Sequence, residues 1–302
     1  MRSAVSPNSL TSLEKHSTKE KWTVDEAYHY CWGVARSHYE NFPVASWFLP
    51  RAARKHIAAV YAFARGADDF ADEPEHRDHR IKGLDRWREM LIDAVRGQAH
   101  HPVFVALGES IRSLSLPVPL LDDLLTAFQM DAVETRYERF EDLLEYSRYS
   151  ANPVGRLVLW ICGHREENLG RLSDAICTGL QLTNFWQDIG LDIRRGRVYL
   201  PSKEMASTGY TLEDLRNEVP DDRFRRLLQP LVERTRELFH AGRPLGRLVR
   251  GGPGFEIRLV CRGGQTILDR IEQADYDVFH RRPKIRTRDK VRLFLGTLSG
   301  RG

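Results

Sequence analysis

The chain has 302 residues, a hydrophobic content of 41%, a charged content of 29% and a formal net charge of +4. These values are typical of a globular protein that buries a large core, and so small and dispersed a positive charge argues against a nucleic-acid partner. The four cysteines show no C-x-x-C spacing, which argues against a zinc site or a disulfide framework. They indicate reduced thiols and a cytoplasmic protein.

Residues 1–20 are polar and rich in serine, and they lack the apolar core of a secretory signal. We expect a disordered tail over residues 1–20 and one all-α domain over residues 21–302. No run approaches the ~20 apolar residues of a membrane span. Any membrane contact is therefore expected to be peripheral.

From Thr23 onward, the apolar residues follow a helical pattern almost throughout. Thr23 and Glu26 have the spacing of a capping box and predict a helix that continues to His38. Further helices are expected from Pro50 to just before Pro74 and over residues 76–97, 102–114, 119–133, 141–149, 153–162, 167–192, 253–281 and 286–298. Two or three more fill residues 202–250. No strand-like alternation, hairpin signal or internal repeat is present.

Two of these helices carry acidic motifs. The first places Asp68 and Asp72 four residues apart, and the second places Asn184, Asp188 and Asp192 at the same spacing. Residues four apart lie on one helix face, about 6 Å apart along the axis. Two such faces opposite each other would bring up to five oxygen-bearing side chains together, and a divalent cation relieves the repulsion between the carboxylates. The sequence therefore predicts a Mg²⁺–diphosphate site.

A solvated helix face is the simpler explanation for acidic residues at this spacing. Two features argue against it. Apolar residues surround both motifs, and each motif has an arginine nearby, Arg65 in the first case and Arg197 in the second. The planar guanidinium group suits the oxygens of a diphosphate.

The chain resembles the squalene/phytoene synthase family, the head-to-head prenyl synthases of the isoprenoid-synthase fold. The family motif R-x-x-D-D-x-x-D is matched by Arg65, Asp68, Asp69 and Asp72. The second motif, with its following R-x-Y, is matched by Gln181, Asn184, Asp188, Asp192, Arg197 and Tyr199. The resemblance runs from about residue 25 to the C-terminus, and it implies a single-domain helical bundle around a central cavity.

The resemblance also implies roles for individual residues. Mg²⁺ would be held by Asp68, Asp72, Asn184, Asp188 and Asp192, and the diphosphate by Arg65 and Arg197. The remaining contacts with a prenyl substrate would come from His38, Phe42, Tyr61, Phe63, Tyr146, Asn152, Gln181 and Tyr199. Aromatic residues at this spacing are also common in a core. A weaker group of Asp131, Arg136 and Tyr137 is expected to be structural.

Two stretches depart from the general family pattern. At Asn152-Pro153 the chain departs from the family's cavity-lining motif, and the sequence fits a helix N-terminus aimed into the cavity as well as a plain helix break with an Asn cap. At residues 38–43, Glu40 stands where many relatives that condense two farnesyl diphosphates place serines. A carboxylate there disfavours a second diphosphate, unless Glu40 points to solvent.

The sequences of residues 38–50 and 149–159 most resemble those of the hydroxysqualene synthases of the hopanoid branch. This resemblance implies ionisation of presqualene diphosphate and capture of the cation by water, giving hydroxysqualene and diphosphate. Tyr146, Asn152 and Tyr199 are candidates for holding the water. The alternatives are condensation of two prenyl diphosphates to presqualene diphosphate, squalene or phytoene, and a non-catalytic scaffold role.

The segment from His280 to Arg292 is rich in lysine and arginine. Such a segment is most often a solvated helix face. It also suits a peripheral contact with anionic lipids, near the pathway enzymes that would supply a membrane-soluble substrate.

Overall fold

The computed structural model describes residues 21–37, 48–72, 79–133 and 136–298. Within these ranges every regular element is a helix and no strand is present, which confirms the all-α prediction. The chain divides into two compact units. Unit 1 comprises residues 1–135 and 156–165, and unit 2 comprises residues 136–155 and 166–302.

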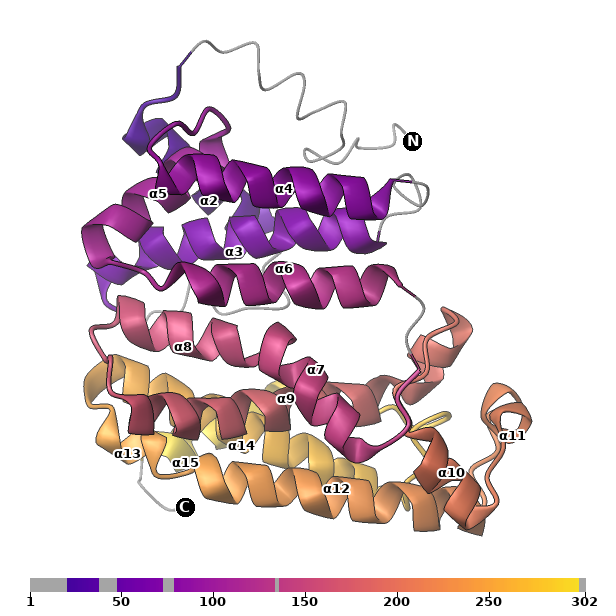
Figure 1. Ribbon diagram of the computed structural model, residues 1–302. Coiled ribbons are helices and arrows are strands. Elements are labelled where there is room, and N and C mark those ends of the chain that lie inside the picture. The colour runs from indigo at the N-terminus through magenta and orange to yellow at the C-terminus, as the bar shows by residue number, and fades with distance from the viewer. Residues whose placement is uncertain (1–20, 38–47, 73–78, 134–135, 299–302) are drawn as a thin grey trace, which may run out of the picture. The chain divides into compact units, whose positions relative to one another are not determined.

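Unit 1 is organised around α3 (Arg51–Asp72). This helix packs against α2 (Val24–Ser37), α4 (Arg80–Val95), α5 (Pro102–Leu114) and α6 (Val118–Ala132), as Figure 1 shows. The predicted capping box starts α2, because the backbone N–H of Glu26 donates to Thr23 Oγ1 and that of Thr23 donates to the Glu26 carboxylate. The helix α8 (Asn152–Ile161) begins in unit 2 and continues into unit 1.

The core of unit 1 is rich in aromatic residues, and it includes Phe70, which lies within the first acidic motif on α3. Trp87 of α4 is fully buried, donates its indole N–H to the backbone oxygen of Phe63 at 3.1 Å, and packs edge-on against Phe70 and Phe104. A Cβ on Gly66 would lie 2.5 Å from the Trp87 ring, closer than atoms can pack. Glycine at this position therefore lets α4 approach α3 one residue after Arg65.

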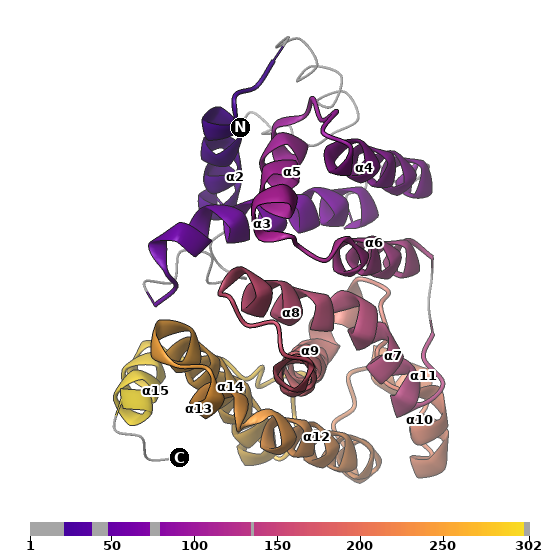
Figure 2. The same ribbon diagram turned by 60° about the vertical axis from the view of Figure 1, so that its left-hand side comes forward.

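Unit 2 is organised around α9 (Glu167–Arg194), which carries the second motif. It packs chiefly against α12 (Asp222–Gly242), and also against α14 (Gly251–Gln273) and α7 (Phe140–Ser150) (Figure 2). The shorter helices of this unit are α10 (Ser202–Thr208), α11 (Leu212–Arg216) and α13 (Leu245–Leu248). The last helix, α15 (Thr287–Leu298), packs chiefly against α14.

Close contacts on several sides hold α9 in place. Its fully buried Trp186 donates to Thr235 Oγ1 of α12 at 2.8 Å. A Cβ on Gly155 of α8 would lie 2.4 Å from Ser173 Oγ and from Cys177 Sγ. Gly155 thus permits a close helix approach, and the rotation of α9 is fixed near its middle.

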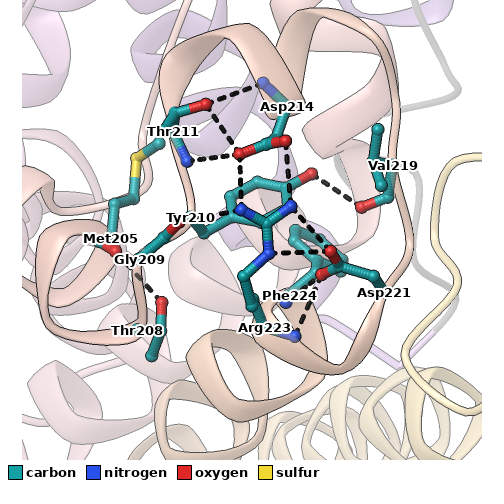
Figure 3. A network of polar contacts seen from close by, with 10 residues as sticks. All are labelled: Met205, Thr208, Gly209, Tyr210, Thr211, Asp214, Val219, Asp221, Arg223 and Phe224. Carbon is teal, nitrogen blue, oxygen red and sulfur yellow. Dashed lines mark hydrogen bonds and ion pairs between the residues drawn. The ribbon is translucent and has the colours of Figure 1, made fainter.

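A polar corner beside α9 supports the loop that follows it. Figure 3 shows Arg223, at the start of α12, between two carboxylates: its side chain donates to Asp221 at 2.8 Å and to Asp214 at 3.0 Å. Thr211 and Asp214 form the capping box that starts α11. Leu215 of α11 lines a small cleft together with residues 197–200, so the corner supports the loop that carries Arg197 and Tyr199.

The predicted helices match the observed ones closely, with two differences. The helix predicted over residues 253–281 ends at Gln273, because Asp275 and Tyr276 adopt left-handed backbone angles (φ of 57° and 64°) that no α-helix can include. Residues 202–250 form four helices and not two or three, since a left-handed Gly209 ends the first after seven residues and Pro244 begins a separate four-residue helix.

Candidate active site

The first motif, in unit 1, forms a network of charges centred on Arg65. Its guanidinium lies 2.6 Å from Asp69 Oδ1 and 3.2 Å from Asp68 Oδ2. Asp69 is almost fully buried, whereas the Asp68 side chain keeps 38% of its surface exposed. Asp69 therefore orients Arg65, while Asp68 remains accessible to a ligand.

The electrostatics of this network keep Arg65 charged. Burial alone would lower the pKa of Arg65, but the carboxylates of Asp69 and Asp68 raise it above its ordinary value. The positioning role of Asp69 is absent from the predicted set of site residues. The adjacent aspartates of the motif were the signal for it, because side chains at neighbouring helix positions point about 100° apart and cannot both face the same ligand.

The other predicted residues of unit 1 have different environments. Tyr61 is half-buried, and burial raises the pKa of its hydroxyl. Phe63 is fully buried and packs against Trp87 and Phe104, which favours a core role over the predicted contact with substrate. Asp72 is the last residue of α3. Its side chain lies outside the described residues, as do His38, Glu40 and Phe42.

The second motif, in unit 2, already holds a cationic group. Arg282 Nε donates to Asp188 Oδ1 at 2.6 Å, and both side chains are about one-third exposed. A second contact brings the same segment to α9, because Gln187 Nε2 donates to the backbone oxygen of Pro283 at 2.7 Å. The sequence placed Arg282 in a general basic segment and did not connect it to the motif.

Asp192 lies one helical turn beyond Asp188, and its negative charge is less well neutralised by nearby cations. Burial, and then the nearby charge of Asp188, raise the pKa of Asp192 to about 6, although Arg197, Arg195 and Arg282 oppose this rise. A carboxylate in this state gains from any additional cation. Gln181 is half-buried and Asn184 is exposed on the same helix.

An aromatic cluster lies beside this part of α9. Phe185 stacks face to face on Tyr199 with ring centroids 3.8 Å apart, and Tyr137 stacks on Tyr199 at 6.0 Å. Tyr146 of α7 completes the cluster at 5.7 Å from Tyr137 and 6.0 Å from Phe185. Two of the predicted residues, Tyr146 and Tyr199, are thus brought together. Tyr137, which the sequence assigned to a structural group, joins them.

Asn152 is the first residue of α8, and its side chain binds within the protein. Asn152 Oδ1 accepts a hydrogen bond of 2.9 Å from Thr178 Oγ1 of α9. This contact fixes the start of α8 against α9, so the helix break predicted at Asn152-Pro153 has a structural basis of its own.

The donor chemistry of both motifs suits Mg²⁺, which prefers carboxylate and amide oxygens. The guanidinium on Asp188 and the raised pKa of Asp192 indicate an α9 surface that attracts cations. Among the residues that the structure describes, no three carboxylate, imidazole or thiol groups converge in a ready-made metal site. The two motifs belong to different units, and the expectation that they face each other stays a prediction.

Comparisons with known proteins point to one family. A sequence model described as squalene/phytoene synthase matches residues 35–289. Hydroxysqualene synthase from Rhodopseudomonas palustris is 38% identical over 235 residues, which cover 77% of this chain and 78% of that protein. The 15-cis-phytoene synthase of Synechococcus elongatus is 30% identical over 281 residues, which cover 89% and 91%.

Solved structures agree with this result. The squalene synthase HpnC from Alicyclobacillus acidocaldarius is 41% identical and aligns with a TM-score of 0.80, covering 84% of this chain and 95% of that one. A dehydrosqualene synthase solved with a ligand gives the same TM-score of 0.80 at 24% identity, covering 92% and 97%, which supports the fold alone. In the described part of the chain, no helix combines the length and the apolar character that crossing a bilayer requires.

Proposed function

This chain is an enzyme of the squalene/phytoene synthase family, and we propose that it converts presqualene diphosphate and water into hydroxysqualene and inorganic diphosphate. The family implies a prenyl diphosphate substrate. The choice of presqualene diphosphate is supported by the similarity to the hydroxysqualene synthase of Rhodopseudomonas palustris. The carboxylate of Glu40 in the sequence also disfavours a second diphosphate.

The observation that carries the proposal is the pair of carboxylates on α9, whose negative charge attracts cations. Asp188 already holds the guanidinium of Arg282 at 2.6 Å, and Asp192 is half-buried with a raised pKa. We assign Mg²⁺ binding to Asp188, Asp192 and Asn184 on α9, together with Asp68 and Asp72 on α3. When bound, Mg²⁺ would neutralise the negative charge that develops on the departing diphosphate.

Arginine side chains of the protein would also neutralise the charge on the diphosphate. Arg65 is held by Asp69 and stays protonated, so the N–H groups that the two aspartates do not use can donate to a diphosphate oxygen. Arg197 would do the same from the loop after α9. Arg282 has a different role in the proposal: it neutralises Asp188 before the ligand arrives, and it would shift to the diphosphate when a metal ion takes that carboxylate.

The carbon–oxygen bond would break with both electrons leaving on the diphosphate, and an allylic or cyclopropylcarbinyl cation would remain. Tyr137 and Phe185 are buried in this cluster, and Tyr199, the more exposed ring of the three, would offer its π system to stabilise a cation without reacting with it. A water molecule would then form the new carbon–oxygen bond and lose its proton to the diphosphate or to solvent. Tyr146, Tyr199 and Asn152 remain the candidates for holding this water.

Two experiments test the proposal in sequence. First, inorganic diphosphate with Mg²⁺ is expected to raise the Tm by several degrees, whereas diphosphate with EDTA is not; a scaffold protein would respond to neither. Second, presqualene diphosphate and farnesyl diphosphate are supplied separately with Mg²⁺ and no nicotinamide. We expect a C30 alcohol from the first and no turnover of the second. Consumption of farnesyl diphosphate would show that the enzyme condenses two prenyl diphosphates.

A further inference from the structure

A cleft with a volume of about 380 Å³ opens in unit 2 between α12, α13, α14 and α15. None of its lining residues belongs to either acidic motif. Apolar groups form part of its wall: Phe239, Ile257, Cys261 and Leu298. Nothing in the proposed reaction uses this cleft.

Arginine is the commonest polar residue in the lining of the cleft. The described lining holds no aspartate or glutamate, and its basic residues are His240, Arg243, Arg247, Arg258 and Arg262. Arg243 and Arg247 are both exposed. Arg258 donates to the backbone oxygen of Gly246, an uncharged partner that leaves its positive charge uncompensated by that contact. Four guanidinium groups around one apolar cleft form a strong anion-attracting site.

The helix beside the cleft presents an apolar face to solvent. Val291, Phe294, Leu295 and Leu298 of α15 keep 56%, 38%, 58% and 60% of their surfaces exposed. Their spacing of three and four residues places them along one side of the helix. Figure 2 shows α15 alongside α14. Leu298 belongs to both features, because it also lines the cleft.

Cations surround this apolar face. Arg288, Lys290 and Arg292 of α15 are all exposed, and Arg288 precedes Val291 by three residues on the same side. An amphipathic helix with exposed leucine and phenylalanine on one face and basic residues around it is the pattern of a helix that lies in a membrane interface. The long basic side chains reach the headgroups while the apolar groups enter the acyl region.

We propose that α15 and the adjacent arginine cleft form a docking surface for anionic phospholipid membranes. The apolar face of α15 inserts into the interface, and the cleft binds the phosphate of one lipid headgroup. Charge complementarity and the continuity of the two features at Leu298 select this occupant over an uncharged protein surface. The site would also bring the enzyme to the membrane in which a C30 substrate and product dissolve.

Vesicle flotation tests this proposal on the full chain without any substrate. Vesicles of phosphatidylcholine with 30% phosphatidylglycerol are compared with pure phosphatidylcholine, at low salt and at high salt. We expect binding only to the anionic vesicles, and weaker binding at high salt. Because each basic residue at such a surface contributes roughly fivefold in affinity, Arg243→Glu with Arg247→Glu should weaken binding at least 20-fold.

Matched variants separate this surface from general effects. Leu295→Ser with Leu298→Ser should likewise weaken flotation strongly. Ile92→Ser with Val95→Ser removes two exposed apolar residues, each 44% exposed, at the same spacing on α4 and should change nothing. Arg86→Glu with Arg112→Glu reverses two exposed charges in unit 1, which are 60% and 52% exposed, and is the control for net charge.

Several outcomes would overturn the proposal. Equal loss of binding in the control pairs would show that the attraction is not local, and absence of flotation with anionic vesicles would refute the surface outright. Calorimetric binding of inorganic phosphate, lost in the arginine variant while flotation is unchanged, would identify a site for a free anion. A dimer in solution that Leu295→Ser with Leu298→Ser dissociates would identify a second copy of the chain as the occupant.

Discussion

Replacing Asp192 by asparagine should make the metal-free protein more stable while it removes one of the proposed metal ligands. Burial and the charge of Asp188 raise the pKa of Asp192 from 3.8 to about 6, so the folded protein disfavours the ionised form. A change of this size corresponds to about 3 kcal/mol. Because the side chain retains partial contact with water, we expect a gain of about 1–2 kcal/mol in the free energy of unfolding at pH 8.

The sign of this effect depends on pH. A carboxyl group whose pKa is raised by folding binds its proton more tightly in the folded state, so its ionisation costs stability as the pH rises from 3.8 to 6. Above pH 6 the full cost is present. Asparagine cannot ionise, and the advantage of Asp192→Asn should therefore fall by roughly half at pH 5.

Urea denaturation in EDTA at pH 5 and pH 8 measures this difference. Glu237→Gln, an exposed position on α12 of the same unit, removes one negative charge and should change stability by less than about 0.5 kcal/mol. If Asp192→Asn is less stable than the parent at pH 8, or if its advantage does not change with pH, the description of Asp192 as a half-buried carboxylate whose charge is not fully neutralised is wrong.

Three further predictions concern other parts of the chain. Arg282→Gln should lower the Tm in EDTA slightly, by about 0.5–1 kcal/mol of stability, and strengthen Mg²⁺ binding without diphosphate in a calorimetric titration, because Asp188 loses its internal cation. Gly66→Ala should destabilise the protein by about 1–3 kcal/mol in urea, since its Cβ would meet Trp87 at 2.5 Å; an unchanged midpoint would mean that α4 moves freely. Arg223→Ala should lower the Tm at pH 7 and have little effect near pH 2. Asp214, whose pKa is lowered to about 2 by bonds from Thr211 and Arg223, is about half protonated there, and most of its stabilising contribution is lost as the pH falls from 3.8 to 2.

The sequence predicted the helical fold well because its helices have strong local signals. The capping box at Thr23 and Glu26 and the prolines at positions 102 and 119 fix boundaries through local chemistry. The end of α14 could not be predicted in this way, because the left-handed angles at Asp275 and Tyr276 belong to residues other than glycine.

The sequence could predict those residues of the candidate site that lie on one face of a single helix. The spacing of Asp188 and Asp192 placed both on one side of α9, and α9 has this register in the structure. The contact of Arg282 with Asp188 joins positions 94 residues apart, and no local pattern encodes it. Phe63 shows what the spacing cannot predict. An aromatic residue next to a motif has the same spacing whether it contacts a ligand or packs in the core, and the structure favours the core for Phe63.

The origin of the hydroxyl oxygen tests the proposed reaction most directly. Presqualene diphosphate is incubated with the enzyme and Mg²⁺ in ¹⁸O-labelled water, and both products are analysed by mass spectrometry. Capture of a cation by water predicts one ¹⁸O in the C30 alcohol and none in the released diphosphate. Label in the diphosphate, or an unlabelled alcohol, would mean that a phosphorus–oxygen bond breaks instead. Formation of a hydrocarbon alone would contradict the proposed water capture.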